Sequence, residues 1–244
     1  MTDRATARVV GTLFLVATIA GLIGLLLQES VVGGGDYLTA VSAHQDRLAT
    51  GVLLQLVMGV AVVSIAVVIY PVLRRGTERL AMGYVVARAL EAVVYLVSGT
   101  GLLTLITVSE KYVDTDDGTA FAALGQLITA ERDWAGHAIL DAAVFSLGAL
   151  VVNAAFYRSR LVPRWLSVWG LAGAAAYLAV GLLVMYGLEP LSTPQVILEA
   201  PLGLQEIALA LWLIIKGFDT HGAAFPLAVG DAEDQHTPSP RVPA

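Results

Sequence analysis

The chain has 244 residues, of which 57% are hydrophobic and only 14% are charged, whereas soluble domains carry about 45–50% apolar and about 25% charged residues. The apolar residues form long blocks with few charges, which excludes an ordinary soluble enzyme, a disordered protein and a fibrous repeat. The net charge of −6 argues against a nucleic-acid partner, because phosphate binding needs clustered lysine and arginine. The chain has no cysteine, which excludes thiolate catalysis, iron–sulfur clusters and thiolate-bound zinc.

The apolar blocks predict an all-α fold, a polytopic bundle of transmembrane helices within residues 1–218. A spanning helix needs about 20 mainly apolar residues, and the blocks show no strict alternation that would indicate a β-barrel. The first block is longer than the roughly 7–15 apolar residues of a signal peptide and lacks an A-x-A site, so we expect a retained helix. The six predicted spans are 9–27, 48–73, 80–109, 134–157, 165–188 and 194–215.

The connections between the predicted spans differ in length and composition. The turns at 74–79 and 158–164 are short and basic, which predicts that the spans they join are antiparallel neighbours. The longer connections should each carry a short surface helix, one from Asp36 and one over 119–130. The proline-rich and acidic segment 219–244 predicts a disordered cytoplasmic tail.

Arginine and lysine collect in the connections on one side of the predicted bundle. Orientation follows these residues, because basic loops stay on the cytoplasmic side of a membrane. With six spans, this rule predicts that both termini are cytoplasmic. The residues predicted to be cytoplasmic are Arg4, Arg8, Arg74, Arg75, Arg79, Arg158, Arg160, Arg164 and Lys216.

The third predicted span contains two charged residues, Arg88 and Glu91. A charge at the bilayer centre costs at least about 2.5–3.5 kcal/mol, so such residues need a reason to be there. Because they are three residues apart they share a helix face and can form an ion pair. Tyr84 and Tyr95 lie on the same face. At 1.5 Å per residue, Glu91 lies roughly 16 Å from the cytoplasmic end.

The fourth and sixth spans each carry two further ionisable residues on one face. His137 and Asp141 are four apart, and Glu199 and Glu206 are seven apart. Their depths predict a single polar cluster between the third, fourth and sixth spans, open outward if it is open. One arginine would then face three carboxylates, so the cluster should hold a proton or a cation. The alternative is that the Arg88–Glu91 pair only fixes helix register.

Motifs for known cofactors are missing from the sequence. There is no G-x-x-x-x-G-K-[ST], no G-x-S-x-G and no H-E-x-x-H. His137, Asp141 and Glu206 have the residue types of a metal site, but no second histidine is in reach and the set is too rich in oxygen for structural zinc. Only one of the four histidines lies in a span, which argues against haem. We therefore expect no metal and no cofactor.

Several segments together resemble one family. They are Arg88-Ala89-Leu90-Glu91-Ala92, the stretch YRSRLVPRWL at 157–166, and Glu206 followed by LWLIIKG at 211–217. Over about residues 8–217 the chain resembles the bacterial membrane-protein family called domain of unknown function 4386. The resemblance implies a multi-span protein of the bacterial plasma membrane and supplies no activity. The positions that it favours for function are Arg88, Glu91, His137 and Glu206.

Three functional hypotheses follow from these residues. The first is a carrier or sensor that binds or moves a small polar solute or a proton, with its site among Arg88, Glu91, Tyr95, His137, Asp141, Glu199 and Glu206. The second is a scaffold or partner subunit without a site of its own. The third is an intramembrane enzyme on a lipid-like substrate, with His137 and a carboxylate as acid and base. We place the carrier or sensor first and lean against an enzyme; the lipid bilayer is the partner that the sequence itself indicates.

Overall fold

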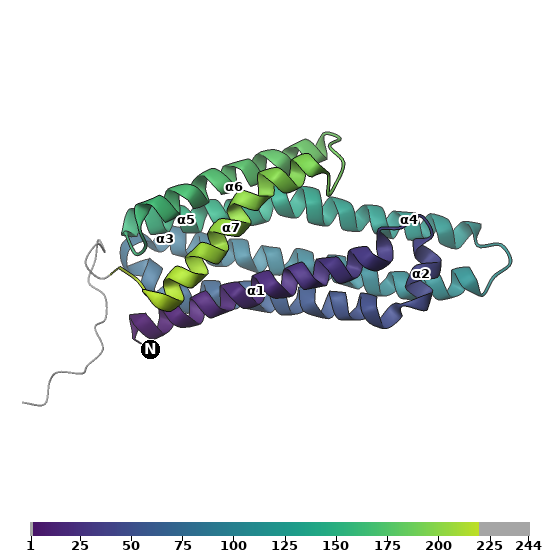
Figure 1. Ribbon diagram of the computed structural model, residues 1–244, viewed down its shortest axis with the longest axis horizontal. Helices are drawn as coiled ribbons and strands as arrows, with labels where there is room; N and C mark the ends of the chain where they lie inside the picture. The colour runs from purple at the N-terminus through teal and green to yellow at the C-terminus, as the bar shows by residue number, and fades with distance from the viewer. Residues whose placement is uncertain (1, 220–244) are drawn as a thin grey trace, which may run out of the picture.

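A computed structural model describes residues 2–219, apart from the side chains of Asp141 and Ala142, and shows a helical bundle (Figure 1). The described residues form helices and their connections, without a strand, which confirms the all-α prediction. The predicted tail lies outside the described residues from position 220 onward. The helices are α1 (Asp3–Val32), α2 (Tyr37–Ala43), α3 (Gln45–Val113), α4 (Thr119–Asp133), the π-helix η1 (Trp134–Phe145), α5 (Ser146–Ser159), α6 (Arg164–Met185) and α7 (Thr193–Ile215).

Five continuous helical segments are long and apolar enough to span a membrane, among them α1, α6 and α7. Their outward faces carry large apolar side chains that remain exposed, such as Leu22 on α1, Leu90 on α3 and Ile197 on α7. Exposed apolar surface on this scale is rare on a soluble monomer, whereas lipid tails cover it without penalty. The bundle is therefore that of an integral membrane protein.

Helix α3 is a hairpin that contains two of the predicted spans. Thr77 leaves the helical conformation, with φ −151° and ψ 63°, and the chain reverses there. The two arms run antiparallel, because the Gln45 side chain donates to Glu110 (3.0 Å) and Gln55 donates to the carbonyl of Tyr95 (3.2 Å). The predicted turn at 74–79 is thus reduced to one non-helical residue. When the two arms of α3 are counted separately, the five apolar helical segments become six.

Helices α4, η1 and α5 follow one another without a break over 41 residues. At about 1.5 Å per residue they are roughly twice as long as the 30 Å hydrocarbon core, so part of this rod lies outside it. The segment 119–130 is helical as expected, but it continues into the span instead of forming a separate surface helix. At its start, the Thr119 hydroxyl and N–H donate to Asp117, which holds the pKa of Asp117 below its usual value.

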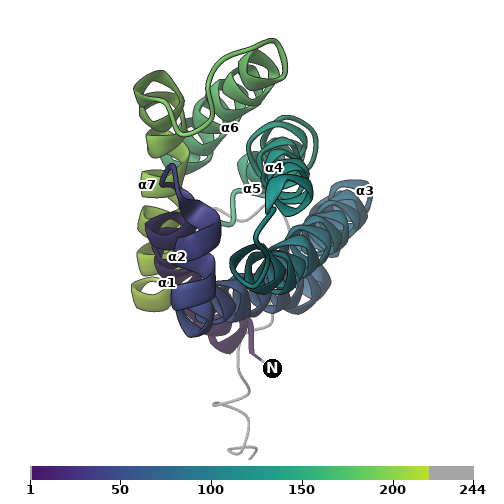
Figure 2. The same ribbon diagram turned by 90° about the vertical axis from the view of Figure 1, so that its right-hand side faces the viewer.

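The helices form a ring in the order α1, α3, α5, α6 and α7, with one end of α7 packed back against α1 (Figures 1 and 2). Glycines allow the closest approaches. A Cβ added at Gly11 would lie 2.6 Å from the Ala210 carbonyl oxygen of α7, and one at Gly24 would lie 3.0 Å from the Gly51 carbonyl oxygen of α3. Small residues at these crossings let the backbones meet, as is common between membrane helices.

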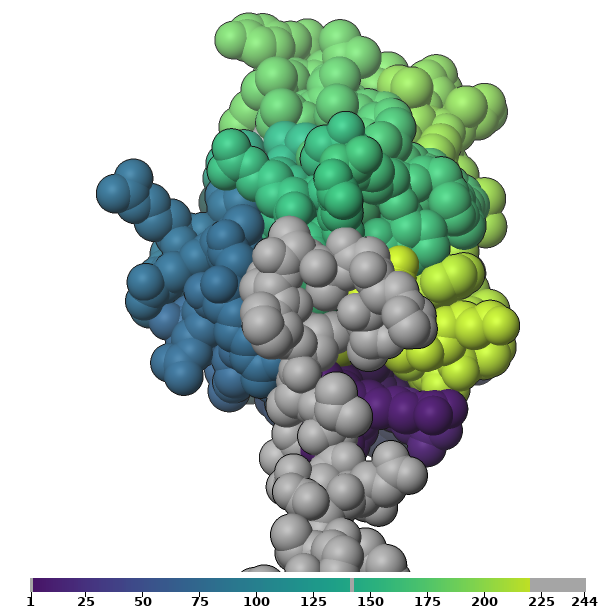
Figure 3. All heavy atoms as spheres, turned by 90° about the vertical axis from the view of Figure 1, so that its left-hand side faces the viewer, coloured from purple at the N-terminus to yellow at the C-terminus, as the bar shows by residue number. Residues whose placement is uncertain are grey.

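Two apolar clusters occupy the two ends of the bundle. One lies around Leu73, Tyr84 and Phe156, near the turn of α3, and the other joins α2 to the far ends of α1 and α3 around Leu38 and Leu102. The start of α1 and the end of α7 lie side by side at the first end (Figure 3). Along α3, Gln55, Arg88 and Glu91 lie between the residues of the first cluster and those of the second.

Candidate functional site

Arg88 is the centre of a buried polar network on α3. Its Nε donates to the Tyr84 hydroxyl (3.1 Å) and its Nη1 donates to Glu91 Oε2 (2.6 Å). The Tyr95 hydroxyl donates to the other oxygen of Glu91 (3.0 Å). Because the four residues are spaced three or four apart on one helix face, a regular helix is enough to align them. The Arg88 and Glu91 side chains are both only 1% exposed.

Helix α7 adds a second carboxylate to Arg88. Glu206 Oε1 lies 3.5 Å from Nη2 of Arg88, so each nitrogen of the guanidinium faces a different oxygen-bearing group. The rings of Tyr84 and Phe145 lie 5.2 and 5.3 Å from the guanidinium carbon, within the range of cation–π attraction. One arginine thus faces two carboxylates from two helices, which leaves one negative charge over when all three groups are ionised.

A cavity of about 260 Å³ lies beside this group. Arg88, Glu91, Tyr95 and Glu206 form its polar wall. The opposite wall is apolar and comes mostly from α1, and Tyr177 of α6 and Phe145 of η1 add aromatic surface. The apolar lining residues are Phe14, Ala17, Gly21, Leu22, Leu25, Met58, Val62 and Leu140.

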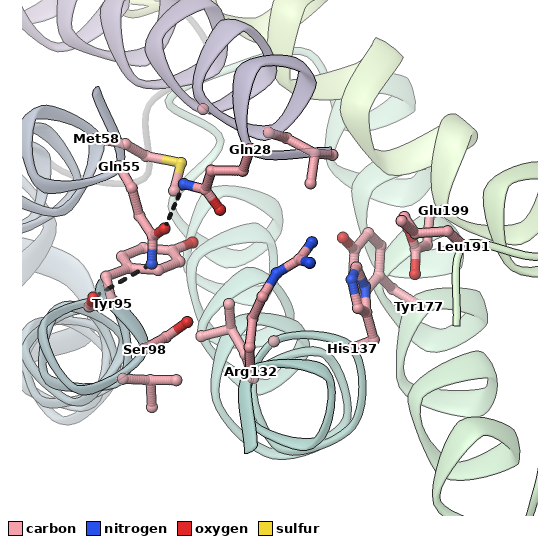
Figure 4. A pocket seen from close by; sticks show the side chains of 15 residues that line it. Gln28, Gln55, Met58, Tyr95, Ser98, Arg132, His137, Tyr177, Leu191 and Glu199 are labelled. Atoms are coloured by element: carbon pink, nitrogen blue, oxygen red, sulfur yellow. Dashed lines mark hydrogen bonds between the residues drawn. The ribbon is translucent and has the colours of Figure 1, made fainter. Parts of the chain in front are cut away.

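A second cavity of about 230 Å³ is lined by residues nearer to α2, among them Gln28 toward the end of α1 (Figure 4). The two volumes share several lining residues, so they adjoin each other, and together they are called the internal space. Tyr95 stands where they meet, because it lines both and its hydroxyl holds Glu91. The shared lining residues are Gly21, Leu25, Met58, Tyr95, Leu140 and Tyr177.

His137 and Glu199 line this second cavity and are joined through a carboxamide. The Gln195 Nε2 lies 3.3 Å from His137 Nδ1 and donates to Glu199 Oε1 at 2.7 Å. Because an amide nitrogen only donates, this hydrogen bond requires the His137 tautomer in which Nδ1 accepts and Nε2 carries the proton. Gln195 is fully buried, and its own Oε1 accepts from the backbone N–H of Leu191.

Polar pairs between helices complete the second cavity. Arg132, at the end of α4, forms an ion pair with Glu29 at the end of α1. Gln28 of α1 donates to Gln55 of α3 at 2.8 Å (Figure 4). These contacts connect α1, α3 and α4 around the second cavity.

The structure brings four of the seven sequence candidates together and places two others apart from them. Arg88, Glu91, Tyr95 and Glu206 form one group, whereas His137 and Glu199 lie in the second layer instead of the single cluster that we expected. The side chain of Asp141 lies outside the described residues. Residues of the first, second and fifth spans also line the space, which the prediction did not include.

Sequence reasoning missed the amide residues of the interior. Gln55, Gln195 and Gln205 lie within predicted spans, Gln28 directly follows one, and all four are at most 9% exposed. The prediction considered charged side chains, histidine and tyrosine as intramembrane polar groups and passed over these amides. A search for every hydrogen-bonding side chain within and next to the predicted spans would have found them, because an amide in lipid also needs a partner.

The described side chains do not group in the way that a metal centre needs. Among residues 2–219, excluding the two undescribed side chains, no three histidine, aspartate or glutamate residues come close enough to hold an ion. The polar groups instead pair with arginine, tyrosine and amides. The arrangement can bind a proton or a small molecule by charge and hydrogen bonds.

Comparison with known proteins places the chain in a family and assigns no activity. The family described as "Domain of unknown function (DUF4386)" matches residues 9–217. No curated protein and no solved structure matches the chain.

Proposed function

Since the chain belongs to the DUF4386 family, whose description states no activity, we propose a role from the cavity itself: the protein binds a small solute or a proton beside Arg88, as a carrier or a sensor. The observation that carries this proposal is the 260 Å³ cavity whose polar wall holds one arginine and two carboxylates. A proton or a positively charged group at Glu206 would neutralise the surplus charge, which is costly in a poorly solvated interior.

The scaffold hypothesis has less support from these contacts. A pair that only fixes helix register is expected to be packed on every side. Arg88, Glu91 and Glu206 instead all line open volume, and the Glu206 side chain is 16% exposed. Open space beside a charged side chain does not help to fix helix register, because the residues that line the space lose dispersion contacts.

The enzyme hypothesis has no matching geometry among the described side chains. A general acid–base pair needs direct hydrogen-bond reach, or reach through one water. The hydrogen-bond partner found for His137 is the amide of Gln195, and the nearby Glu199 is held by the same amide. The bridge orients both groups but does not transfer a proton.

Glu206→Gln tests the proposal, because it removes one charge and keeps an oxygen toward Arg88. We expect some members of a panel of amines, amino acids and sugars to raise the Tm of the purified protein, since a ligand that binds the folded state stabilises it. Glu206→Gln should reduce or abolish these shifts. Glu189→Gln, an exposed acid in the α6–α7 connection, is the matched control. Unchanged shifts in folded Glu206→Gln protein would refute the site.

A further inference from the structure

The cavity beside Arg88 has an opening between α1 and α7. The two helices cross at Gly11, where the α7 backbone is in contact, and diverge from there toward the α2 end (Figure 1). The cavity lies in the angle between them, since Phe14, Thr18 and Leu22 of α1 and Glu206 of α7 all line it.

The opening faces the lipid-covered surface. Leu22 lines the cavity, yet it is 57% exposed on the outside of α1. It is therefore at the mouth of the gap. At this level the outside of α1 is otherwise an apolar surface, with Ile19, Ile23 and Leu26 exposed. A molecule dissolved among the lipid tails or at their polar border meets this gap before it meets water.

The residues that line the cavity determine which charge and which shape of ligand it can bind. Arg88 already faces Tyr84, Glu91 and Glu206 with its three nitrogens, so it offers little to an anion. The surplus charge is negative and lies on the α7 side, at Glu206. Phe145 and Tyr177 pack together with their ring centroids 4.9 Å apart, and with Tyr95 they give the cavity aromatic surface that attracts cations.

Resting on the function proposed above, we propose that the ligand is a small lipophilic organic cation, a substituted ammonium with an apolar group, which enters between α1 and α7. Its charge lies against Glu206, and its apolar part lies against the α1 wall. The cavity volume of about 260 Å³ is just below the usual range of about 300–1,000 Å³ for ligand pockets, which suits a small molecule.

The binding test uses benzyltrimethylammonium as the probe, because this permanent cation has no proton to exchange. The full chain is placed in phosphatidylcholine nanodiscs, and radiolabelled probe is measured against empty nanodiscs. We expect saturable binding that benzenesulfonate, an anion with the same ring, does not displace. Glu206→Gln should weaken binding at least tenfold, and Glu189→Gln should leave it unchanged. No saturable binding to the wild type, or equal binding to Glu206→Gln, overturns the proposal.

The route is tested with bulky side chains on the outside of α1. Leu22→Trp places an indole at the mouth of the gap, whereas Leu26→Trp places one at an equally exposed position that does not line the cavity. Association of the probe should slow several-fold in Leu22→Trp and stay unchanged in Leu26→Trp. An unchanged rate in Leu22→Trp overturns access from the lipid side.

The two proposals fail in different ways. If benzyltrimethylammonium does not bind while other solutes raise the Tm in a Glu206-dependent manner, the ligand class is wrong and the site remains. If Glu206→Gln alters neither measurement in folded protein, both the ligand class and the site are wrong.

Discussion

Arg88 shows how a single buried charge is made tolerable in this protein. Its guanidinium is almost fully buried, and each of its three nitrogens faces a tyrosine or glutamate oxygen. Two aromatic rings, those of Tyr84 and Phe145, lie 5.2 and 5.3 Å from its guanidinium carbon. Such a network compensates the arginine only while all members are present, because removal of one leaves its partners without compensation.

Arg88→Met should be among the most destabilising single substitutions in the chain. It would leave Glu91 and Glu206 as two buried carboxylates without their shared cation, at a cost of about 3–5 kcal/mol. The expected result is a clearly lower Tm of the purified protein in detergent.

The triple variant Arg88→Met, Glu91→Gln, Glu206→Gln is the matched comparison. It removes all three charges, so its stability should recover a large part of the loss caused by Arg88→Met alone. If the triple variant is as unstable as the single one, the loss comes from packing and not from uncompensated charge.

At the scale of elements, the crossing of α1 and α7 determines where the cavity begins. Contact at Gly11 holds the helices together at one end, and their divergence creates the gap at the other. The π-helix η1 contributes from the opposite side, since it carries both His137 and Phe145 into the internal space. Wide helical turns of this kind are frequent at functional sites.

Gly11→Ala should destabilise the protein and weaken ligand binding. Its Cβ would lie 2.6 Å from the Ala210 carbonyl oxygen, so α1 and α7 must move apart. Gly203→Ala is the control, because it lies within α7 with open space around an added Cβ. There the greater helix propensity of alanine should leave the Tm equal or higher. Equal Tm values for the two variants would show that the crossing tolerates separation.

For the whole molecule, the predicted six spans and cytoplasmic termini can be tested because the chain has no cysteine. Single cysteines at Glu78 and Asp116, both exposed, mark the turn of α3 and the opposite end of the bundle. In intact bacterial cells, a membrane-impermeant maleimide should label Asp116→Cys at once and Glu78→Cys only after permeabilisation. Labelling of both sites from the same side would contradict the predicted topology.

The sequence predicted the helices better than the contacts between them. The apolar runs identified the segments that form α1, α6, α7 and the two arms of α3, because length and hydropathy are local properties. The Arg88–Glu91 contact was equally predictable from the sequence, since a spacing of three residues on a helix implies it. The pairs Glu29–Arg132 and Gln28–Gln55 could not be predicted from the sequence. Each joins residues on different helices, and the order of residues does not specify how those helices are rotated about their axes.

The amino-acid order alone thus determined an apolar, all-helical protein with costly charges in its interior. In lipid, a segment must satisfy its own backbone hydrogen bonds, and a helix does so within the segment itself. The tertiary structure decided that Glu206 reaches Arg88, that His137 and Glu199 lie in a separate layer, and that a cavity opens between α1 and α7. These features depend on the angle and rotation at which helices pack. Those are determined by contacts such as Gly11 with Ala210, between residues almost two hundred positions apart.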